Sequence, residues 1–227
     1  MGNVRRLGVL VGLPFEAAIL APHHFGNMTV RSAAARPARA RREAAALLAS
    51  GAELLVSFGV AGGLDPALLP GDLLLAETIV DAEGRRYAAD IGARAELLAV
   101  LNDERVRGGA LLGTARVVAT PDAKARLFAG SGAAALDMES LPLAEAAAGA
   151  GRPFIAVRAV ADPAGRAIPG AALAALGAEG RVDFGRLLAA LARRPGDLAG
   201  LPALARDSAR AKAALGRAAL GLARAFG

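Results

Sequence analysis

Short apolar runs alternate along the chain with longer segments of mixed polarity. The runs at 7–11, 54–58, 73–80 and 153–160 predict strands, and those at 110–119 and 133–136 predict two more. Several of them are apolar at nearly every position, which is typical of strands buried on both faces of a parallel sheet. The pattern therefore favours a sheet covered on both sides over an exposed one.

Between these runs lie segments that predict helices, at 14–20, 38–50, 91–101, 122–129, 138–150 and from about 171 onward. Residues 21–37 contain Pro22, Gly26 and Pro37 and predict an irregular connection. Strands that alternate with helices indicate a three-layer α/β/α sandwich around a mixed, mainly parallel sheet. We expect a single domain over 1–227 with a helical C-terminal extension at about 171–227.

The amino-acid composition limits the kinds of catalytic and metal-binding site that the chain can form. Of the residues, 55% are hydrophobic and 21% charged, which excludes a disordered chain. Cysteine is absent and only two histidines occur, His23 and His24. Thiol nucleophiles, disulfides and thiolate or histidine-rich metal sites are thereby excluded, so we expect no metal. Catalysis must rest on carboxylates, arginine, hydroxyls and backbone groups.

The chain is basic, with a formal net charge of +6. Only two of its 27 basic residues are lysines, Lys124 and Lys212. Either a general bias toward arginine or attraction to anions explains it. Aromatic residues make up 4%, too few for stacking platforms, so we expect no nucleic-acid partner. No run predicts a membrane span or a signal peptide, which leaves a cytoplasmic location as the expectation.

Ligands of open α/β sheets bind at the carboxyl ends of strands, and three segments occupy such places. In the first, 59–63, glycines bring backbone N–H groups close to an anion or a sugar oxygen, or simply form a tight turn. The candidate residues there are Gly59, Val60, Ala61 and Gly62.

The other two segments carry charge. Asp137 and Glu139 either grip adjacent hydroxyls or cap the following helix. Arg158 lies inside an apolar strand and needs a carboxylate or a bound anion, and Asp162 follows at the strand end, where a general acid could act. Glu16, after the first strand, is either a fourth candidate or an ordinary helix-start acid.

Taken together, these motifs resemble the nucleoside phosphorylase and nucleosidase superfamily. The resemblance rests on GVAGGL at 59–64, PGD at 70–72, DMES at 137–140 and the strand PFIAVRAVAD at 153–162. It implies the α/β/α fold and cleavage of the N-glycosidic bond of a purine nucleoside. Five further segments resemble the hopanoid-associated phosphorylase branch: 57–66, GLPFE at 12–16, VDFG at 182–185, RRPG at 193–196 and ARD at 205–207. That likeness implies adenine release from adenosylhopane; a methylthioadenosine/S-adenosylhomocysteine-like nucleosidase acting on a soluble substrate is the alternative.

The resemblance also implies roles for single residues. Asp162 would protonate the leaving purine, Glu139 would bind the ribose hydroxyls and Glu16 would position an attacking water. Arg158 would orient the nucleophile or hold phosphate, and Met138 would pack under the ribose. The purine would lie against Val117 and Val118. No cofactor is implied beyond inorganic phosphate as a co-substrate.

Some features depart from the family or go beyond it. Val60 stands where the nucleosidases have a small hydroxyl residue, and the segment 32–37 has no glycine for a phosphate cradle, so water and phosphate both stay open as nucleophile. The family implies a homodimer. In the C-terminal segment, arginines at 206, 210, 217 and 224 form one stripe opposite an apolar stripe at 201, 204, 215, 222 and 226. That helix either covers the sheet or lies on an anionic membrane, at the inner face, beside a lipid-linked substrate.

Overall fold

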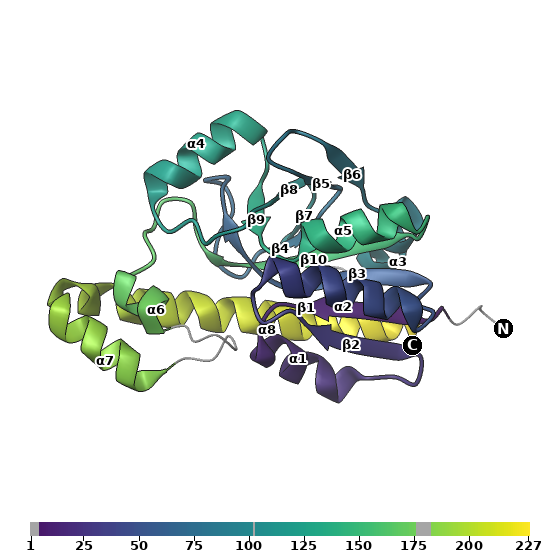
Figure 1. Ribbon diagram of the computed structural model, residues 1–227, viewed down its shortest axis with the longest axis horizontal. Helices are drawn as coiled ribbons and strands as arrows, with labels where there is room; N and C mark the ends of the chain where they lie inside the picture. The colour runs from purple at the N-terminus through teal and green to yellow at the C-terminus, as the bar shows by residue number, and fades with distance from the viewer. Residues whose placement is uncertain (1–4, 102, 176–182) are drawn as a thin grey trace.

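A mixed sheet forms the centre of the molecule. The computed structural model describes residues 5–101, 103–175 and 183–227, and in this part of the chain the sheet has ten strands (Figure 1). The strands are β1 (Leu7–Val11), β2 (Met28–Ser32), β3 (Leu54–Gly63), β4 (Leu73–Leu75), β5 (Thr78–Val80), β6 (Arg86–Ala88), β7 (Val106–Arg107), β8 (Ala110–Gly113), β9 (Ala135–Asp137) and β10 (Phe154–Asp162).

Strand pairing is mostly parallel. The order β6-β5-β8-β9-β3-β10-β4-β7 contains antiparallel pairs at β5–β6, β3–β9 and β4–β10, while β1 pairs in parallel with both β2 and β3. Strands β3 and β10 are the long central pair and run parallel from Leu55 opposite Phe154 to Gly62 opposite Asp162. Their carboxyl ends therefore emerge side by side.

Helices cover both faces, as a three-layer sandwich requires. They are α1 (Pro14–Leu20), α2 (Pro37–Ala49), α3 (Ile91–Leu101), α4 (Pro121–Ser131), α5 (Ser140–Gly149), α6 (Gly170–Ala175), α7 (Phe184–Arg193) and α8 (Leu201–Phe226), with 3-10 turns η1 (Ala21–His23) and η2 (Pro195–Gly200). Along β3, Leu54, Val56 and Phe58 join a core cluster with α1, α3 and α8. Leu55 joins the opposite cluster, with α2 and α5. Alternate side chains of one strand thus pack into two cores, one on each face of the sheet. The predicted fold class is confirmed.

Several predicted strand boundaries were wrong. The run 73–80 is two strands because its backbone changes partner: Ala76 N–H donates to Ala156 O, and Glu77 N–H donates to Gly109 O. The predicted strand 110–119 stops at Gly113, beyond which the chain is irregular. The segment 59–63, for which a ligand-binding backbone and a tight turn were the two interpretations, is the continuation of β3 and not a turn. The irregular connection 21–37 contains β2, a partly exposed strand whose polar sequence hid it.

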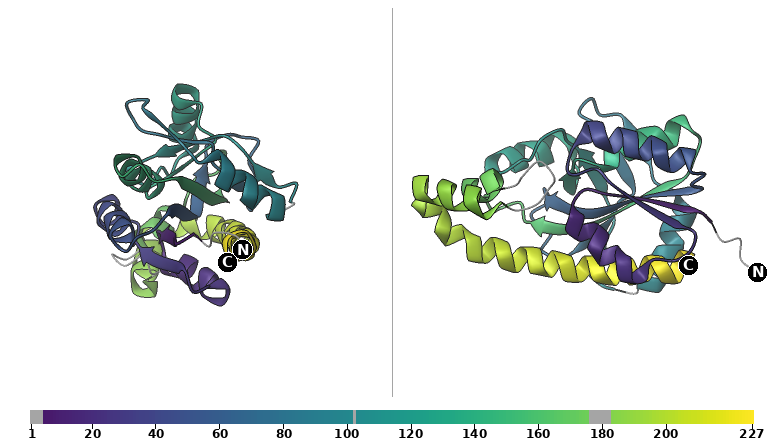
Figure 2. Two further views of the ribbon diagram at one scale, coloured as in Figure 1. Left: turned by 90° about the vertical axis from the view of Figure 1, so that its right-hand side faces the viewer. Right: turned by 60° about the horizontal axis from the view of Figure 1, so that its bottom comes forward.

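The C-terminal extension has two parts (Figure 2). Helices α6 and α7 project beyond the end of the sheet, and α8 runs back along one face of it to a C-terminus near β1 and β2. Leu215, Leu222 and Phe226 of α8 are buried in the core, while the predicted arginine stripe faces solvent. The apolar stripe of α8 therefore covers the sheet. Residues 176–182, and with them Val182 of the predicted tail motif, lie outside the described residues.

Two further contacts hold α8 in place. Asp207, buried on α8, forms an ion pair with Arg166 in the segment after β10. Gly71, with φ of +87°, lies against α8, since a Cβ there would be 3.1 Å from Arg210 Cβ and 3.2 Å from its carbonyl oxygen. The ARD and PGD motifs thus serve the docking of this helix. Within the described residues, no helix is both long and apolar enough to span a membrane.

Candidate active site

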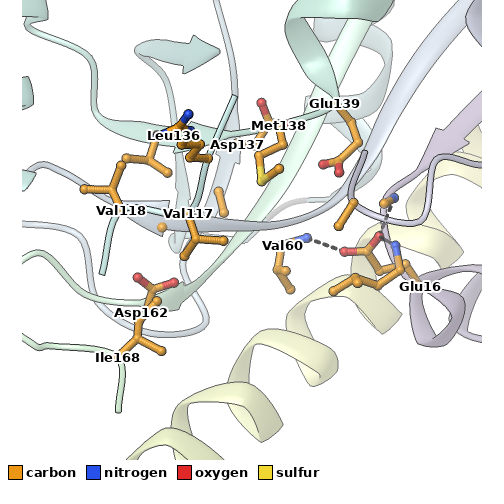
Figure 3. A pocket seen from close by; sticks show the side chains of 16 residues that line it. Glu16, Val60, Val117, Val118, Leu136, Asp137, Met138, Glu139, Asp162 and Ile168 are labelled. Atoms are coloured by element: carbon orange, nitrogen blue, oxygen red, sulfur yellow. Dashed lines mark hydrogen bonds between the residues drawn. The ribbon is translucent and has the colours of Figure 1, made fainter. Parts of the chain in front are cut away.

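A cavity opens where the carboxyl ends of β1, β3, β9 and β10 converge, as expected for an open α/β sheet (Figure 3). The start of α1 and the irregular segment after β8 complete its walls. Its lining consists of Gly12, Leu13, Glu16, Ala35, Val60, Ala61, Gly62, Arg116, Val117, Val118, Leu136, Asp137, Met138, Glu139, Asp162 and Ile168. Most of the predicted site residues are thus brought together, although they come from five separate segments.

The cavity has two chemically different ends. At one end, Asp162 lies among the apolar side chains of Val117, Val118, Leu136 and Ile168 (Figure 3). At the other end lie Glu139 and Glu16, with Met138 and Val60 between the two ends (Figure 3). The expectation that Glu139 and Asp162 open into one cavity is confirmed. The arrangement suits a flat apolar group at one end and a polar, hydroxylated group at the other.

Backbone N–H groups hold Glu16. Gly12 N–H and Leu13 N–H donate to Oε2 at 2.7 Å each, and Val60 N–H donates to Oε1 at 2.8 Å. The first two donors belong to the turn between β1 and α1, and the third belongs to β3. This explains why the chain needs the GLPFE turn: the turn itself supplies the donors that fix its own glutamate.

Arg158 lies beneath the cavity and is fully buried. Its Nη2 forms an ion pair with Asp137 and donates to Ser57 Oγ at 2.5 Å and to Ser140 Oγ at 3.1 Å. The Asp137 carboxylate also accepts the Ser140 O–H at 2.6 Å and the Ser140 N–H at 3.1 Å. Asp137 is therefore the internal counter-ion of Arg158. Of the two acids Asp137 and Glu139, it is Glu139 that is available to a ligand.

One nitrogen of that guanidinium has no hydrogen-bond partner in the part of the chain that the structure describes. Among the described residues, Arg158 Nη1 makes no hydrogen bond although it is buried. A Cβ added to Gly59 would lie 2.4 Å from Glu16 Oε1 and 2.5 Å from Nη1, so both polar atoms pack closely against this glycine. Gly59 is thus required for close approach, and a side chain here would displace the two groups. A buried donor without a partner points to a small polar ligand.

Charge accumulates at this end of the cavity. Glu16, Asp137 and Glu139 surround a single guanidinium, whose Nη2 is 3.9 Å from Glu139 Oε2. Burial raises the pKa of Glu139 to about 8, against the attraction of Arg158 and with added repulsion from Asp137 and Glu16. Burial also raises the pKa of Glu16, opposed by Arg158 and by its three N–H donors. Because three buried carboxylates and one cation cannot all stay charged at low cost, the site favours a proton or a positively charged ligand.

The glycine-rich segment differs from its prediction. Gly59–Gly62 is extended strand, and Val60 N–H is used by Glu16 rather than left free for an anion. Ala34 and Ala35, where a glycine-rich cradle was missing from the sequence, adopt left-handed φ values of 51° and 53°. This conformation is uncommon for alanine, and Ala35 lines the cavity.

Two basic residues at the site were not predicted. Arg116 lines the cavity from the segment after β8. Lys124 of α4 is completely buried, and its Nζ is 2.5 Å from Asp162 Oδ2. The rarity of lysine in a chain otherwise biased to arginine was the available signal for Lys124. Burial raises the pKa of Asp162, and the Lys124 ammonium opposes that rise.

Solved structures share this architecture. The 5′-methylthioadenosine/S-adenosyl homocysteine nucleosidase of Helicobacter pylori superposes with a TM-score of 0.65 at 18% identity, over 71% of this chain and 87% of that one. Futalosine hydrolase of the same organism gives 0.65 at 18%, over 73% and 88%. The S-adenosylhomocysteine nucleosidase of Streptococcus pyogenes gives 0.66 at 22%, over 73% and 86%. At these identities the likeness concerns the fold.

The sequence itself establishes the family. The profile of the phosphorylase superfamily matches residues 30–194, which is more than half of the chain. The protein therefore belongs to the phosphorylase superfamily, and the predicted class, an enzyme of the nucleoside phosphorylase and nucleosidase type, is confirmed. No curated protein sequence matches the chain.

Proposed function

We propose that this protein cleaves the N-glycosidic bond of an adenine nucleoside and releases adenine. The observation that carries the proposal is the cavity with two ends, an acid among apolar side chains at one and buried carboxyls at the other. Fold neighbours named as methylthioadenosine/S-adenosylhomocysteine nucleosidases and a futalosine hydrolase support it. Both carboxyls and the arginine are present, which argues against a binding module without activity.

Asp162 acts at the base. As the bond between N9 of the purine and C1′ of the sugar breaks, its electron pair passes to the purine ring. Asp162 gives its proton to N7, so that a neutral base leaves instead of an anion. Val117, Val118 and Ile168 supply an apolar slot for the ring. Burial raises the pKa of Asp162, which favours the protonated form that a general acid needs.

The carboxyl end acts at the sugar. Glu139 binds the ribose hydroxyls, Met138 packs against the ring, and positive charge develops at C1′ as the base leaves. In its ionised form Glu139 interacts more favourably with that charge than with the neutral ground state, which is the requirement for catalysis. Glu16 accepts the proton of the water that attacks C1′.

Glu16, whose carboxyl lines the cavity, places the attacking water. Arg158 Nη1 packs against Gly59 next to Glu16 Oε1, and its positive charge acts on that carboxyl from beneath the cavity. Inorganic phosphate as the alternative nucleophile would rely on Arg116 at the cavity wall and the strained turn at Ala34 and Ala35. We propose no other co-substrate or cofactor.

The finer proposal is that the nucleoside is adenosylhopane, a lipid-linked substrate. It rests on the motif likeness, with support from the extension: Ile168 lines the cavity just before α6, and the projecting α7 and η2 expose Leu188 and Leu198 to 68% and 55%. Because the apolar face of α8 is in the core, membrane contact is assigned to α7 and η2. The fold neighbours favour the alternative, a soluble 5′-thioadenosine.

The decisive experiment is an adenine-release assay on a panel of 5′-substituted adenosines, with and without phosphate. Adenine release from at least one compound supports the proposal, and no release from any compound in either condition contradicts it. Phosphate dependence separates a phosphorylase from a hydrolase, and preference for a hopane-linked over a methylthio substituent separates the two substrates.

Binding partners are tested separately. Truncation of α8 would remove core residues, so membrane contact is measured by flotation of anionic liposomes with the full chain and with Leu188→Glu. Equal flotation would contradict the contact. The homodimer expected from the family is tested by sedimentation, and the cytoplasmic location by cell fractionation.

A further inference from the structure

Lys124 is an unusual residue in this chain. It is one of two lysines among 27 basic residues, and its side chain is completely buried. The second lysine, Lys212, is exposed on α8 with its Nζ 4.9 Å from the centre of the Phe15 ring. Burying an ammonium is costly unless every one of its protons finds an acceptor. A buried lysine therefore needs an explanation in its surroundings.

All three protons of Lys124 Nζ have acceptors, and all three lie at the end of β10. They are Asp162 Oδ2 at 2.5 Å, Pro163 O at 2.9 Å and Asp162 O at 3.3 Å. The side chain comes from α4, whose first turn is held by the N-cap Thr120. It follows that α4 carries a fixed positive charge to a single point, the back of the Asp162 carboxyl group.

The other side of that carboxyl faces the cavity. Asp162 lines it with a side chain that is 18% exposed, and no described residue donates a hydrogen bond to Oδ1. The backbone of Gly62 also lies close to the carboxyl, because a Cβ added to this glycine would be 3.1 Å from Oδ2. Oδ2 is thus held from behind by the ammonium, and Oδ1 is left for a ligand.

We propose that Lys124 is the positioning residue of the general acid: it orients the Asp162 carboxyl through Oδ2 and stabilises the carboxylate that remains once Oδ1 has given its proton to the purine. This inference rests on the proposed function. In the step, the proton passes from Oδ1 to N7 as the bond to C1′ breaks, and the negative charge left on Asp162 is paired with the ammonium, which keeps all its protons.

The electrostatics of the surroundings agree with this role. Burial of Asp162 alone would hold its proton too tightly, and the ammonium opposes that effect, which makes the acid stronger. Of the other charged groups that line the cavity, Arg116 lies on the segment after β8, Asp137 is paired with Arg158, and Glu16 and Glu139 lie at the opposite end. Among the described residues, Lys124 is the charged group that forms an ion pair with the Asp162 carboxyl.

The first measurement needs no turnover. Carbon NMR of the aspartate carboxyls, with Asp162→Asn for assignment, follows the titration of Asp162 in the wild type, Lys124→Met and Lys124→Gln. Lys124→Gln keeps donors for the carbonyl oxygens, so it separates lost charge from lost hydrogen bonds and serves where Lys124→Met fails to fold. The pKa of Asp162 should rise in both variants and stay unchanged in Lys212→Met. An unchanged pKa without Lys124 overturns the proposal.

The second measurement compares two leaving groups. Adenine needs protonation to leave, whereas 4-nitrophenolate from a nitrophenyl riboside does not. Loss of the charge-assisted contact should slow adenine release on the order of 10- to 100-fold and leave nitrophenolate release within about threefold, with the alkaline limb of kcat/KM moved to higher pH. Lys124→Arg, which restores a cation, should recover part of the loss.

Equal loss on both substrates, or an unmoved alkaline limb, would mean a structural role only and overturns the proposal. If the wild type cleaves neither substrate, the proposed function fails by itself, while the NMR titration still decides whether Lys124 controls Asp162.

Discussion

The buried pair of Arg158 and Asp137 is expected to contribute strongly to the stability of the fold. The Asp137 side chain is 1% exposed and that of Arg158 is 0% exposed, so neither charge has water to replace its partner. Asp137→Asn keeps the shape and an acceptor for the Ser140 N–H but removes the charge. The variant should therefore isolate the electrostatic part of the contact.

The magnitude follows from burial. Breaking a buried ion pair by removing one partner costs about 3–5 kcal/mol. The retained amide hydrogen bonds return about 1 kcal/mol. We therefore expect a loss of about 2–4 kcal/mol from a domain stability of about 5–15 kcal/mol. Measurement at a pH well below 8 keeps the proton on Glu139, so that relief of its repulsion with Asp137 does not offset the loss.

The assay is urea unfolding followed by far-ultraviolet circular dichroism. The matched control is Glu145→Gln, the same carboxylate-to-amide change at the exposed pair with Arg41, whose side chains are 60% and 33% exposed. That change should cost about 0–1 kcal/mol. A midpoint for Asp137→Asn no lower than that of Glu145→Gln, at equal slopes, would show that the buried pair adds no stability. Because Asp137 raises the pKa of Glu139, the variant should also lower that pKa.

Three further outcomes are expected. The folded-state pKa of Glu139, about 8, lies above its ordinary value of 4.5, so the native state keeps the proton to higher pH than the unfolded chain does. The stability of the fold should therefore fall as pH rises from 4.5 to about 8. In Glu139→Gln the dependence of Tm on pH should flatten across that window, and an unchanged slope would contradict the pKa shift. Gly59→Ala should lower adenine release by at least about tenfold, because its Cβ would lie 2.4 Å from Glu16 Oε1 and 2.5 Å from Arg158 Nη1; wild-type rates would refute the close approach. Gly216→Ala is its control, since a Cβ there meets nothing within 4 Å in the middle of α8, and it should raise stability by about 0.5–1 kcal/mol with activity unchanged, as thermal melts would measure.

Local patterns predicted much of the fold. The apolar runs of β1, β3 and β10 and the helices α1, α2, α3 and α5 were visible from periodicity, because each buries a face along its own length. Short or partly exposed strands were not. β2, β6 and β7 bury too little apolar surface to produce a pattern, and the break between β4 and β5 arises from a change of pairing partner, which periodicity does not record.

For the site, the sequence by itself determined which residue types arrive at the strand ends: Glu16, Glu139 and Asp162 each follow or end an apolar run, and Arg158 interrupts one. Only the tertiary structure decided how their charges are shared. It paired Arg158 with Asp137 and brought Lys124, 38 positions away along the chain, to the back of Asp162. The physical reason is distance along the chain. The hydrogen bonds and side-chain periodicity of a helix or strand depend on residues a few positions apart, whereas a buried charge is compensated by whichever opposite charge the tertiary packing places beside it.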